Sequence, residues 1–254
     1  ISACLVGSEM CIRDRKYFDK VDVVAPLSRY EEVWCKDRKL NVKIVRSGLD
    51  FSSFYKPVKI SGEHAPKVLV SMGALGPHRR FEVTIQVVAK LRNEGHDVRA
   101  VIIAKKLDKN ENSYETIVRN LIHRLGVDEY VELRTEGVSE EELLQVYDSA
   151  HILVHPVFLP PPQYYGWGLV VFEAMAAGLP VVLCSTTGAT EVLTDGKNAL
   201  FAEPDDVESF ALGVKRLITD PEYYGRIAQN GQNFVKDSIS WDRYTESMME
   251  LFKE

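Results

Sequence analysis

The sequence has few cysteines, and none of them is paired at the spacing of a metal site. Four cysteines occur among 254 residues, and the two that follow residue 15, Cys35 and Cys184, lie far apart. Neither has a second Cys or His at zinc-ligand spacing, and two distant cysteines indicate no disulfide framework. We therefore expect both to be reduced and structural.

A membrane-spanning run and an excess of basic charge are also missing. No uninterrupted apolar stretch reaches the roughly 18 residues that span a bilayer, and the first residues lack a basic region followed by an apolar one. The formal net charge of -6 gives no overall attraction to nucleic acid or to anionic lipid. We therefore expect a cytoplasmic protein with no integral membrane segment and no nucleic-acid partner, in which a local cluster of charges meets any anionic ligand.

The first fifteen residues look foreign to the rest of the chain. The run from Cys4 to Asp14 can be written in codons that end ATG TGT ATA AGA GAC, and Arg15 continues the reading frame. This run resembles translated sequencing-adapter DNA. We therefore expect residues 1–15 to be a non-native segment that carries no information about the fold.

Six short apolar runs alternate with longer segments of helical spacing. The runs are rich in Val, Ile and Leu, as strands buried on both faces of a sheet require. This alternation predicts an α/β fold, a doubly wound, Rossmann-like parallel sheet with helices on both faces. The expected strands span residues 67–75, 98–104, 130–134, 152–157, 180–185 and 198–203.

Helices are expected between and after these strands. Arg80 to Asn93 carries apolar residues at helical spacing, and Ser139 with Glu142 has the pattern of a capping box. Ser240 is the expected N-cap of the last helix. The three helices that end the chain are expected at about 205–219, 221–236 and 240–253.

The chain before the first of these strands indicates a second structural unit. Residues 22–57 are predicted to form a strand, a helix, a strand and a turn at Ser47-Gly48, as at the end of another domain. We therefore expect residues 16–50 to be the tail of a preceding domain with its linker. Residues 51–238 form the main domain in this division, and residues 239–254 form a terminal helix.

The segment from Tyr164 to Val182, YYGWGLVVFEAMAAGLPVV, carries the strongest functional signal. A strand ends before it and a helix begins near Gly168, so backbone N–H groups face the carboxyl edge of the sheet. Doubly wound sheets bind ligands at this edge, and a helix N-terminus favours anions such as phosphate. Glu173 lies about 7.5 Å further along the helix. Its carboxylate either accepts hydrogen bonds from two ribose hydroxyls or simply faces solvent.

Part of this segment, GLVVFEAMAAGLPVV, resembles the signature of glycosyltransferase family 4, the group 1 glycosyltransferases. That signature is Glu, seven residues, Glu, then Ala-Met-Ala-x-Gly-x-Pro-Val, and the similarity extends over roughly residues 20–254. In the family the second Glu contacts the donor ribose, and Glu173 occupies its place. Tyr165 stands where the family has its first Glu, near the donor sugar. Gly168 and Leu169 match the loop whose backbone amides approach the sugar and the phosphates.

A second matching segment, SMGALGPHRRFEVTI, contains two adjacent arginines after the first expected strand. Guanidinium groups stay charged and offer forked donors to a diphosphate, although adjacent arginines are also common on protein surfaces. The segment resembles the family pattern Gly-Arg-x-x-x-x-Lys-Gly, with Gly73 at its Gly and Arg79 at its Lys. Ala74 replaces the family's Arg, and Arg80 is a candidate substitute for the missing charge.

Further positions have both a functional and a structural interpretation. Arg134, at the end of the third expected strand, lies where the family's nucleobase pocket forms. Gly188 and Glu191 match a Gly-x-x-Glu turn beside the family's donor pocket, or they form a structural cap. His155 is either a packed residue at a strand end or a catalytic base. No Asp-x-Asp element occurs, so we predict no metal site and expect Arg79 and the helix N-terminus to neutralise the diphosphate.

The resemblance implies the C-terminal, donor-binding domain of a two-domain GT-B enzyme. Residues 16–50 are then a short remnant of the N-terminal acceptor domain, and residues 239–254 are a helix that returns to it. The implied reaction is metal-independent, retaining transfer of a hexose-like sugar from a UDP- or GDP-sugar to an unknown acceptor, with no other cofactor. Arg79 and Glu173 are the expected catalytic residues.

Two alternatives to an intact transferase remain open. The first is a non-catalytic nucleotide-binding module, which Tyr165 and Ala74 favour because the family has charged residues there. The second is a sugar-nucleotide epimerase of similar fold. Because most of the acceptor domain is missing, we expect the 254-residue chain to be inactive alone. The expected partners are that domain and the nucleotide-sugar donor, and the full-length enzyme can also make peripheral contact with a membrane.

Overall fold

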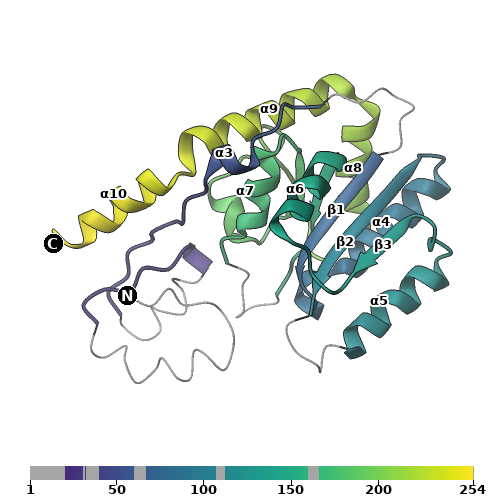
Figure 1. Ribbon diagram of the computed structural model, residues 1–254, viewed down its shortest axis with the longest axis horizontal. Helices are drawn as coiled ribbons and strands as arrows, with labels where there is room; N and C mark the ends of the chain where they lie inside the picture. Colours follow the sequence, from purple (N-terminus) through teal and green to yellow (C-terminus); the bar gives the residue numbers. More distant parts are fainter. Residues whose placement is uncertain are drawn as a thin grey trace.

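The centre of the structure is a six-stranded sheet in which all neighbouring strands are parallel (Figure 1). The computed structural model describes residues 21–30, 32, 40–59, 67–106, 112–159 and 166–253. Each strand falls on a run that the sequence predicts as a strand, which confirms the α/β class. The strands are β1 (Lys67–Ala74), β2 (Val98–Lys105), β3 (Val131–Arg134), β4 (Ile152–His155), β5 (Val181–Cys184) and β6 (Leu200–Ala202).

The order of the strands reverses in the middle of the sheet. The spatial order is β3-β2-β1-β4-β5-β6, so the chain winds outward from β1 on one side and from β4 on the other. A reversal of this kind leaves a crevice outside the carboxyl ends of the two central strands. Leu69 pairs with Ile152, and Val70 pairs with Leu153. This register places Ala74 and His155, the last residues of β1 and β4, at the same edge.

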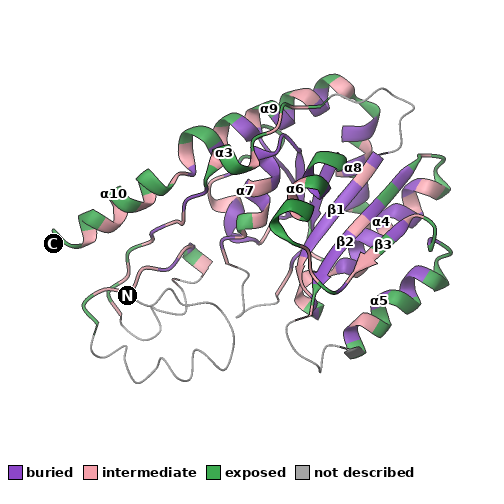
Figure 2. Cartoon of the chain, viewed as in Figure 1, coloured by how far each residue is buried: buried purple, intermediate pink, exposed green. Residues whose placement is uncertain are grey.

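The strands are largely buried (Figure 2), and their alternating side chains enter two cores, one on each face of the sheet. On β1, Leu69 enters one core while Val70 and Met72 enter the other, as the period of two in a strand requires. The first core is covered by α4 (Phe81–Asn93), α5 (Asn112–Arg124) and α8 (Val207–Thr219). The second is covered by α6 (Glu140–Ser149) and α7 (Leu169–Ala176), and α9 (Pro221–Ser238) contributes to both.

Two of the helices begin at caps that the sequence predicts. The Ser139 hydroxyl accepts a hydrogen bond from the Glu142 N–H (3.2 Å), and the Glu142 carboxylate accepts one from the Ser139 N–H (2.7 Å). Ser240 caps α10 (Trp241–Leu251) by accepting from the Arg243 N–H at 3.3 Å. These caps satisfy N–H groups that have no partner within the helix. Both predicted helix starts are confirmed.

In the described residues before β1, the two strands expected from the sequence are reduced to a single bridge. Val24 and Val42 form a single parallel bridge in place of two strands, and much of the helix expected between them lies outside the described residues. A short helix, α3 (Phe51–Phe54), follows the predicted turn. Leu49 forms a bridge with Ser240, and a Cβ on Gly48 would lie 2.3 Å from the carbonyl carbon of Ser240. Only glycine fits where the linker crosses the start of α10.

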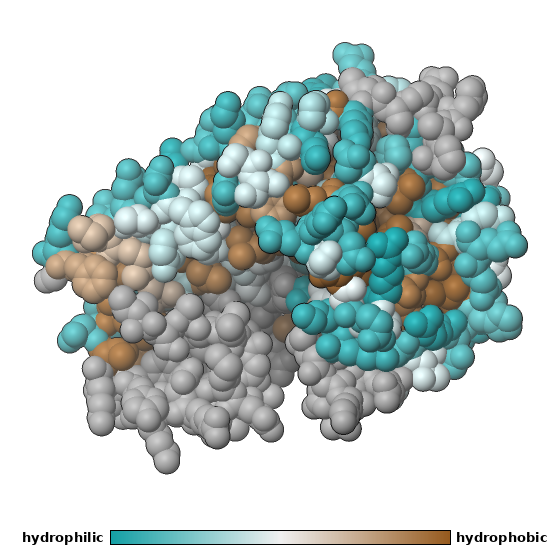
Figure 3. Space-filling model, viewed as in Figure 1, coloured by the Kyte–Doolittle hydropathy of each residue, from teal (hydrophilic) through white to brown (hydrophobic). Residues whose placement is uncertain are grey.

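The C-terminal helix α10 buries none of its residues. The side chains of Trp241, Met249 and Phe252 are 50%, 53% and 68% exposed, and apolar atoms are visible at this end of the molecule (Figure 3). Neither α10 nor any other helix in the described part of the chain is long and apolar enough to cross a membrane. The apolar residues Trp241, Met249 and Phe252 at this end of the chain lie on the surface of the described structure.

His155 is a buried polar residue at the end of β4, with 1% of its surface exposed. Burial, and to a smaller extent the positive charge of Arg79, lowers the pKa of its imidazole to about 3. The side chain is therefore neutral at physiological pH. This environment supports the interpretation of His155 as a packed strand-end residue.

We predict that Gly48→Ala destabilises the contact between the linker and α10. The added methyl group overlaps the backbone of Ser240 and Trp241, and overpacking of this kind costs about 1–3 kcal/mol. Amide hydrogen exchange should rise along α10. Gly126→Ala is the control: its φ of +65° strains an alanine, but a Cβ there meets nothing within 4 Å, so the variant is destabilised without a change at α10, and exchange along α10 should not rise selectively. Unchanged exchange in α10 of the Gly48 variant would contradict the steric argument.

We predict that His155 makes the protein less stable in acid. Its folded-state pKa is about 3, below the ordinary value of 6.5. Between these two values the unfolded state binds a proton that the folded state does not, so the free energy of unfolding is highest above pH 6.5 and decreases as the pH falls toward 3. The slope from this one group is at most about 1.4 kcal/mol per pH unit. Urea unfolding at several pH values should show a shallower slope for His155→Gln. His123→Gln, whose side chain is 87% exposed, should retain the wild-type slope.

Candidate functional site

The candidate site begins where β1 ends, at Gly73. Its φ is +154°, and a Cβ at this position would lie 2.6 Å from the guanidinium carbon of Arg79. Arg79 is the last residue of η2 (Pro77–Arg79), the 3-10 turn between β1 and α4. The absence of a side chain at position 73 lets the Arg79 guanidinium lie directly against the end of the strand. The structure thus brings these two predicted site residues together.

Arg80 has a different environment from its neighbour. Its Nη2 atom lies 2.8 Å from the Asp205 carboxylate, and its guanidinium lies 5.9 Å from the centroid of the Phe158 ring. Its backbone is left-handed, with φ 51° and ψ 40°, at the junction of η2 and α4. The two adjacent arginines therefore lie in separate places, Arg79 against β1 and Arg80 in an ion pair.

The loop before α7 is fixed by an aromatic side chain. Trp167 is buried and packs on Phe172 with 4.6 Å between ring centroids, and the Arg46 guanidinium covers it at 5.5 Å from the ring. Gly168 follows in a left-handed conformation with φ 73° and forms the N-cap of α7 without a side-chain hydrogen bond. Leu169, the first residue of α7, is 38% exposed. The positive end of this helix therefore favours an anion.

The turn after β5 is tied to this loop and to the linker. The N–H of Gly188 donates to the carbonyl of Gly166 at 3.2 Å. Glu191 accepts hydrogen bonds from the Arg46 guanidinium at 2.8 Å and from the backbone N–H of Arg29 at 2.7 Å. Its carboxylate thus joins η4 (Gly188–Glu191) to the segment that precedes the main domain. These contacts support the structural interpretation of the turn.

Glu173 lies on α7 beside a buried tyrosine. Its Oε2 atom accepts a hydrogen bond from the Tyr147 hydroxyl at 2.9 Å, and the same hydroxyl lies 3.3 Å from the sulfur of Met72. Burial raises the pKa of Glu173, and the hydrogen bond from Tyr147 opposes that shift. Because Met72 precedes Gly73 on β1, Tyr147 connects the Glu173 carboxylate to the strand end that Arg79 covers. Glu173 is therefore not a solvated surface residue.

Arg134, another predicted residue, is not joined to this cluster. Arg134 makes a bidentate contact with Glu132 at 2.7 and 3.1 Å, and this contact raises its pKa. Both residues are on β3, which is separated from β1 by β2. Tyr165 lies outside the described residues.

Tyr147 and Asp205 are residues of the site that were not expected from the sequence. A sequence signal for Tyr147 exists, because it follows Leu143 and Val146 on the apolar face of a predicted helix, and a buried Tyr hydroxyl normally needs a partner. Asp205 gives no such signal. It precedes Asp206, which caps α8, and nothing in the local sequence indicates an ion pair with a residue 125 positions away.

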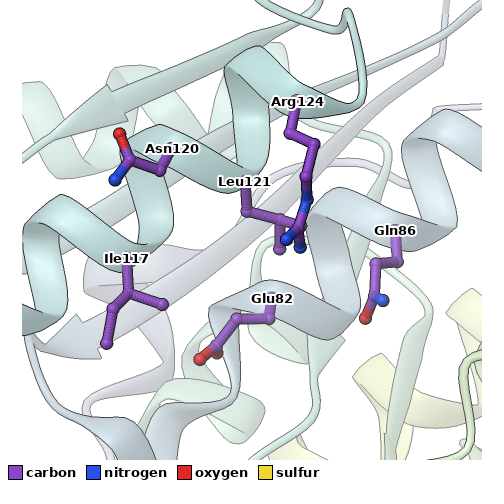
Figure 4. Close-up of a pocket in the computed structure, with 6 residues that line it drawn as sticks. All are labelled: Glu82, Gln86, Ile117, Asn120, Leu121 and Arg124. Carbon is purple, nitrogen blue, oxygen red and sulfur yellow. The ribbon is translucent and has the colours of Figure 1, made fainter.

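A surface hollow of about 420 Å³ lies elsewhere, between α4 and α5 (Figure 4). All of its lining residues come from these two helices, and none comes from a strand end or from the loop before α7. It is therefore separate from the candidate site. The lining residues are Glu82, Gln86, Ile117, Asn120, Leu121 and Arg124.

The fold is similar to that of known glycosyltransferase structures. Sucrose-phosphate synthase from Thermosynechococcus elongatus matches with a TM-score of 0.80 and 19% identity over 97% of this chain and 61% of that one. The HepE protein of Anabaena, solved with UDP and glucose, matches with a TM-score of 0.82 and 20% identity over 96% of this chain and 66% of that one. These likenesses confirm the predicted GT-B, Rossmann-like fold.

Curated relatives match at the level of sequence. An uncharacterized glycosyltransferase of Methanocaldococcus jannaschii is 28% identical over 74% of this chain and 45% of its own. A GDP-mannose-dependent phosphatidylinositol monomannoside mannosyltransferase of Mycolicibacterium smegmatis is 28% identical over 72% of this chain and 47% of its own. The chain spans about half the length of these relatives.

The family comparison covers most of the main domain. The model that describes the glycosyl transferases of group 1 matches residues 56–234. This range contains the whole sheet, the Arg79 turn and α7 with Glu173. Because the match extends over well more than half of the sequence, the chain belongs to the group 1 glycosyl transferases.

Proposed function

We propose that this chain is the donor-binding part of a glycosyltransferase that moves a sugar from a nucleotide diphosphate to an acceptor. One observation carries the proposal. Where the strand order reverses, the Arg79 guanidinium lies against Gly73 near the end of β1, and the Glu173 carboxylate on α7 is linked through the Tyr147 hydroxyl to Met72, the preceding residue of that strand. A cation and a helix N-terminus suit a diphosphate, and a carboxylate suits the hydroxyls of a ribose.

In this proposal each group of the site binds a different part of the donor. Arg79 and the backbone amides near Gly168 and Leu169 stabilise the negative charge that develops on the departing nucleotide diphosphate. Glu173 accepts hydrogen bonds from the ribose, and Tyr147 orients its carboxylate through the 2.9 Å hydrogen bond. Catalysis is then mainly electrostatic, because the site acts on the leaving group more than on the sugar.

The relatives support a narrower version of this proposal. One is named as GDP-mannose-dependent, and a structural neighbour was solved in complex with UDP-glucose, so we propose a UDP- or GDP-hexose donor. We also propose retention of configuration, as the family resemblance implies. Metal independence, which the sequence suggested because it has no Asp-x-Asp element, is part of the proposal.

A nucleotide-binding module without transferase activity is the second candidate. Ala74 ends β1 at the position where the family resemblance expects an arginine, so one cationic contact to a diphosphate is missing. Ala74→Arg in the full-length parent protein separates the two functions. Increased transfer in this variant supports an enzyme, whereas binding without transfer in both forms supports the module. Consumption of the sugar nucleotide without an acceptor would instead indicate an epimerase.

We predict that the chain binds UDP, GDP or ADP weakly and that Arg79→Ala weakens this binding. Loss of a charged hydrogen bond costs about 1.5–3 kcal/mol, which is about tenfold or more in affinity. Titration calorimetry measures the change. Arg119→Ala is the control, because Arg119 is 52% exposed and pairs with Glu115 on α5, away from the site.

A second prediction concerns catalysis, and an assay of sugar transfer with the same protein tests it. We predict little or no sugar transfer by the 254-residue chain, because it spans about half the length of its relatives and the proposal assigns the acceptor side to the half that it does not span. Tight nucleotide binding together with rapid transfer would refute this part of the proposal. Absence of binding to all three nucleotides would refute the donor site itself.

We predict that Glu173→Gln stabilises the fold while it weakens nucleotide binding. Burial raises the folded-state pKa of Glu173 above 4.5. The protonated side chain therefore contributes its full share to the free energy of unfolding below pH 4.5, and this share is lost as the pH rises through the folded-state pKa. A neutral glutamine avoids this loss, and the gain at pH 8 is on the order of 1 kcal/mol. It should vanish in acid. Thermal unfolding at pH 8 and pH 4 measures the difference.

The binding readout for the same variant uses the ribose. UDP should lose affinity for the Glu173→Gln protein, whereas 2′-deoxy-UDP should lose less, because it already lacks one of the hydroxyls. Glu141→Gln, an exposed residue in the first turn of α6, should change neither stability nor binding by more than a few tenths of a kcal/mol. Equal losses for the two nucleotides would argue against contact between Glu173 and the ribose.

A further inference from the structure

Among the described residues other than glycine, two have a left-handed backbone, and their side chains form an ion pair with each other. Arg80 has φ 51° and Asp205 has φ 56°. Their side chains form an ion pair of 2.8 Å although they are 125 positions apart in the sequence. A left-handed backbone costs free energy for any residue with a Cβ, and such strain persists only where the surroundings enforce it. The pairing of two strained residues therefore requires an explanation.

Arg80 controls the direction of the turn that carries Arg79. It is the residue after η2 and the N-cap of α4, and its N–H donates to the Pro77 carbonyl at 3.2 Å. The turn has a second attachment, because the Phe158 N–H donates to the His78 carbonyl at 2.9 Å. A change of φ at residue 80 would redirect this turn relative to α4. Arg79 would then leave the end of β1.

Asp205 is a firm point of attachment. It lies between β6 and α8, directly before Asp206, whose carboxylate caps α8 by accepting from the N–H groups of Glu208 and Ser209 at 2.9 and 3.2 Å. The helices α4 and α8 share one core on the same face of the sheet. The ion pair therefore joins the N-terminal ends of two packed helices at the carboxyl edge, beside the candidate site.

We propose that the Arg80–Asp205 pair is a positioning device that holds the Arg79 guanidinium against Gly73. The proposal rests on the proposed function, in which Arg79 contacts the donor diphosphate. Arg80 then contacts no ligand, and its charge is neutralised by Asp205. This assignment differs from a role for Arg80 as a second counterion of the diphosphate, and the two roles predict opposite effects when the Asp205 charge is removed.

The decisive variant is Asp205→Asn. Asparagine tolerates a left-handed backbone as well as aspartate does, so the substitution removes the charge and leaves the turn possible. If Arg80 positions Arg79, UDP affinity falls by about two- to fivefold, the range that a partly exposed ion pair supports. If Arg80 binds the diphosphate directly, affinity rises, because a competing carboxylate has been removed. A rise would overturn the proposal.

Variants of Arg80 provide a second test of the proposal. Arg80→Lys retains a cation for Asp205 and should keep most of the affinity, whereas Arg80→Gly should lose as much as Asp205→Asn. The double variant Arg80→Gly with Asp205→Asn should be no weaker than the weaker single variant, because both changes break one interaction. Additive losses would count against the proposal. Asp97→Asn is the matched control: Asp97 pairs with Arg92 at 2.8 Å with similar exposure, and UDP affinity should not change.

A crystal structure of ligand-free Asp205→Asn separates this proposal from the proposed function. The expected result is an Arg79 guanidinium displaced from Gly73, with thermal unfolding confirming that the protein is folded. An unmoved Arg79 would overturn the positioning role whether or not UDP binds. If wild-type protein binds no nucleoside diphosphate but Arg79 moves in the variant, the donor-binding function fails and the positioning device stands.

Discussion

Arg79 can lie against the end of β1 only because residue 73 has no side chain. This contact depends on the sheet, since the order reversal between β1 and β4 leaves space outside the carboxyl ends of these strands. It also depends on the short turn η2, which brings the arginine back over the strand that it follows. The loop before α7 completes the edge, held by Trp167 on Phe172 and by the Gly188 hydrogen bond to Gly166. A local steric condition thus determines where positive charge meets the edge of a large parallel sheet.

Burial decides which groups near this edge are charged. The imidazole of His155 is held neutral by burial and by the positive charge of Arg79, so it adds no competing positive charge. Glu173 is also largely buried, and its raised pKa shows that the fold disfavours its negative charge. A carboxylate that costs stability, and that is oriented by a buried tyrosine, is typical of a functional position. In the proposed function, the stability of the domain and nucleotide binding are therefore opposed at this residue.

Contacts between distant segments hold the loops of the edge. Glu191 joins the turn after β5 to Arg46 and Arg29 in the segment before the main domain. The Arg80–Asp205 pair joins the turn after β1 to the turn after β6. Gly48 allows the linker to cross the start of α10 at backbone distance. In each case a residue that is polar or unusually small serves the geometry of a neighbouring segment.

The sequence by itself determined the six strands, the capping box at Ser139 and the start of α10. These features depend on the order of apolar residues and on side chains within a few positions of each other, so they can be read locally. The partners of Arg80 and Glu173 were decided by the tertiary structure alone. Asp205 and Tyr147 reach them only after α4 packs with α8 and α6 packs beside α7, because side chains far apart in the sequence meet only when the helices are placed on the sheet.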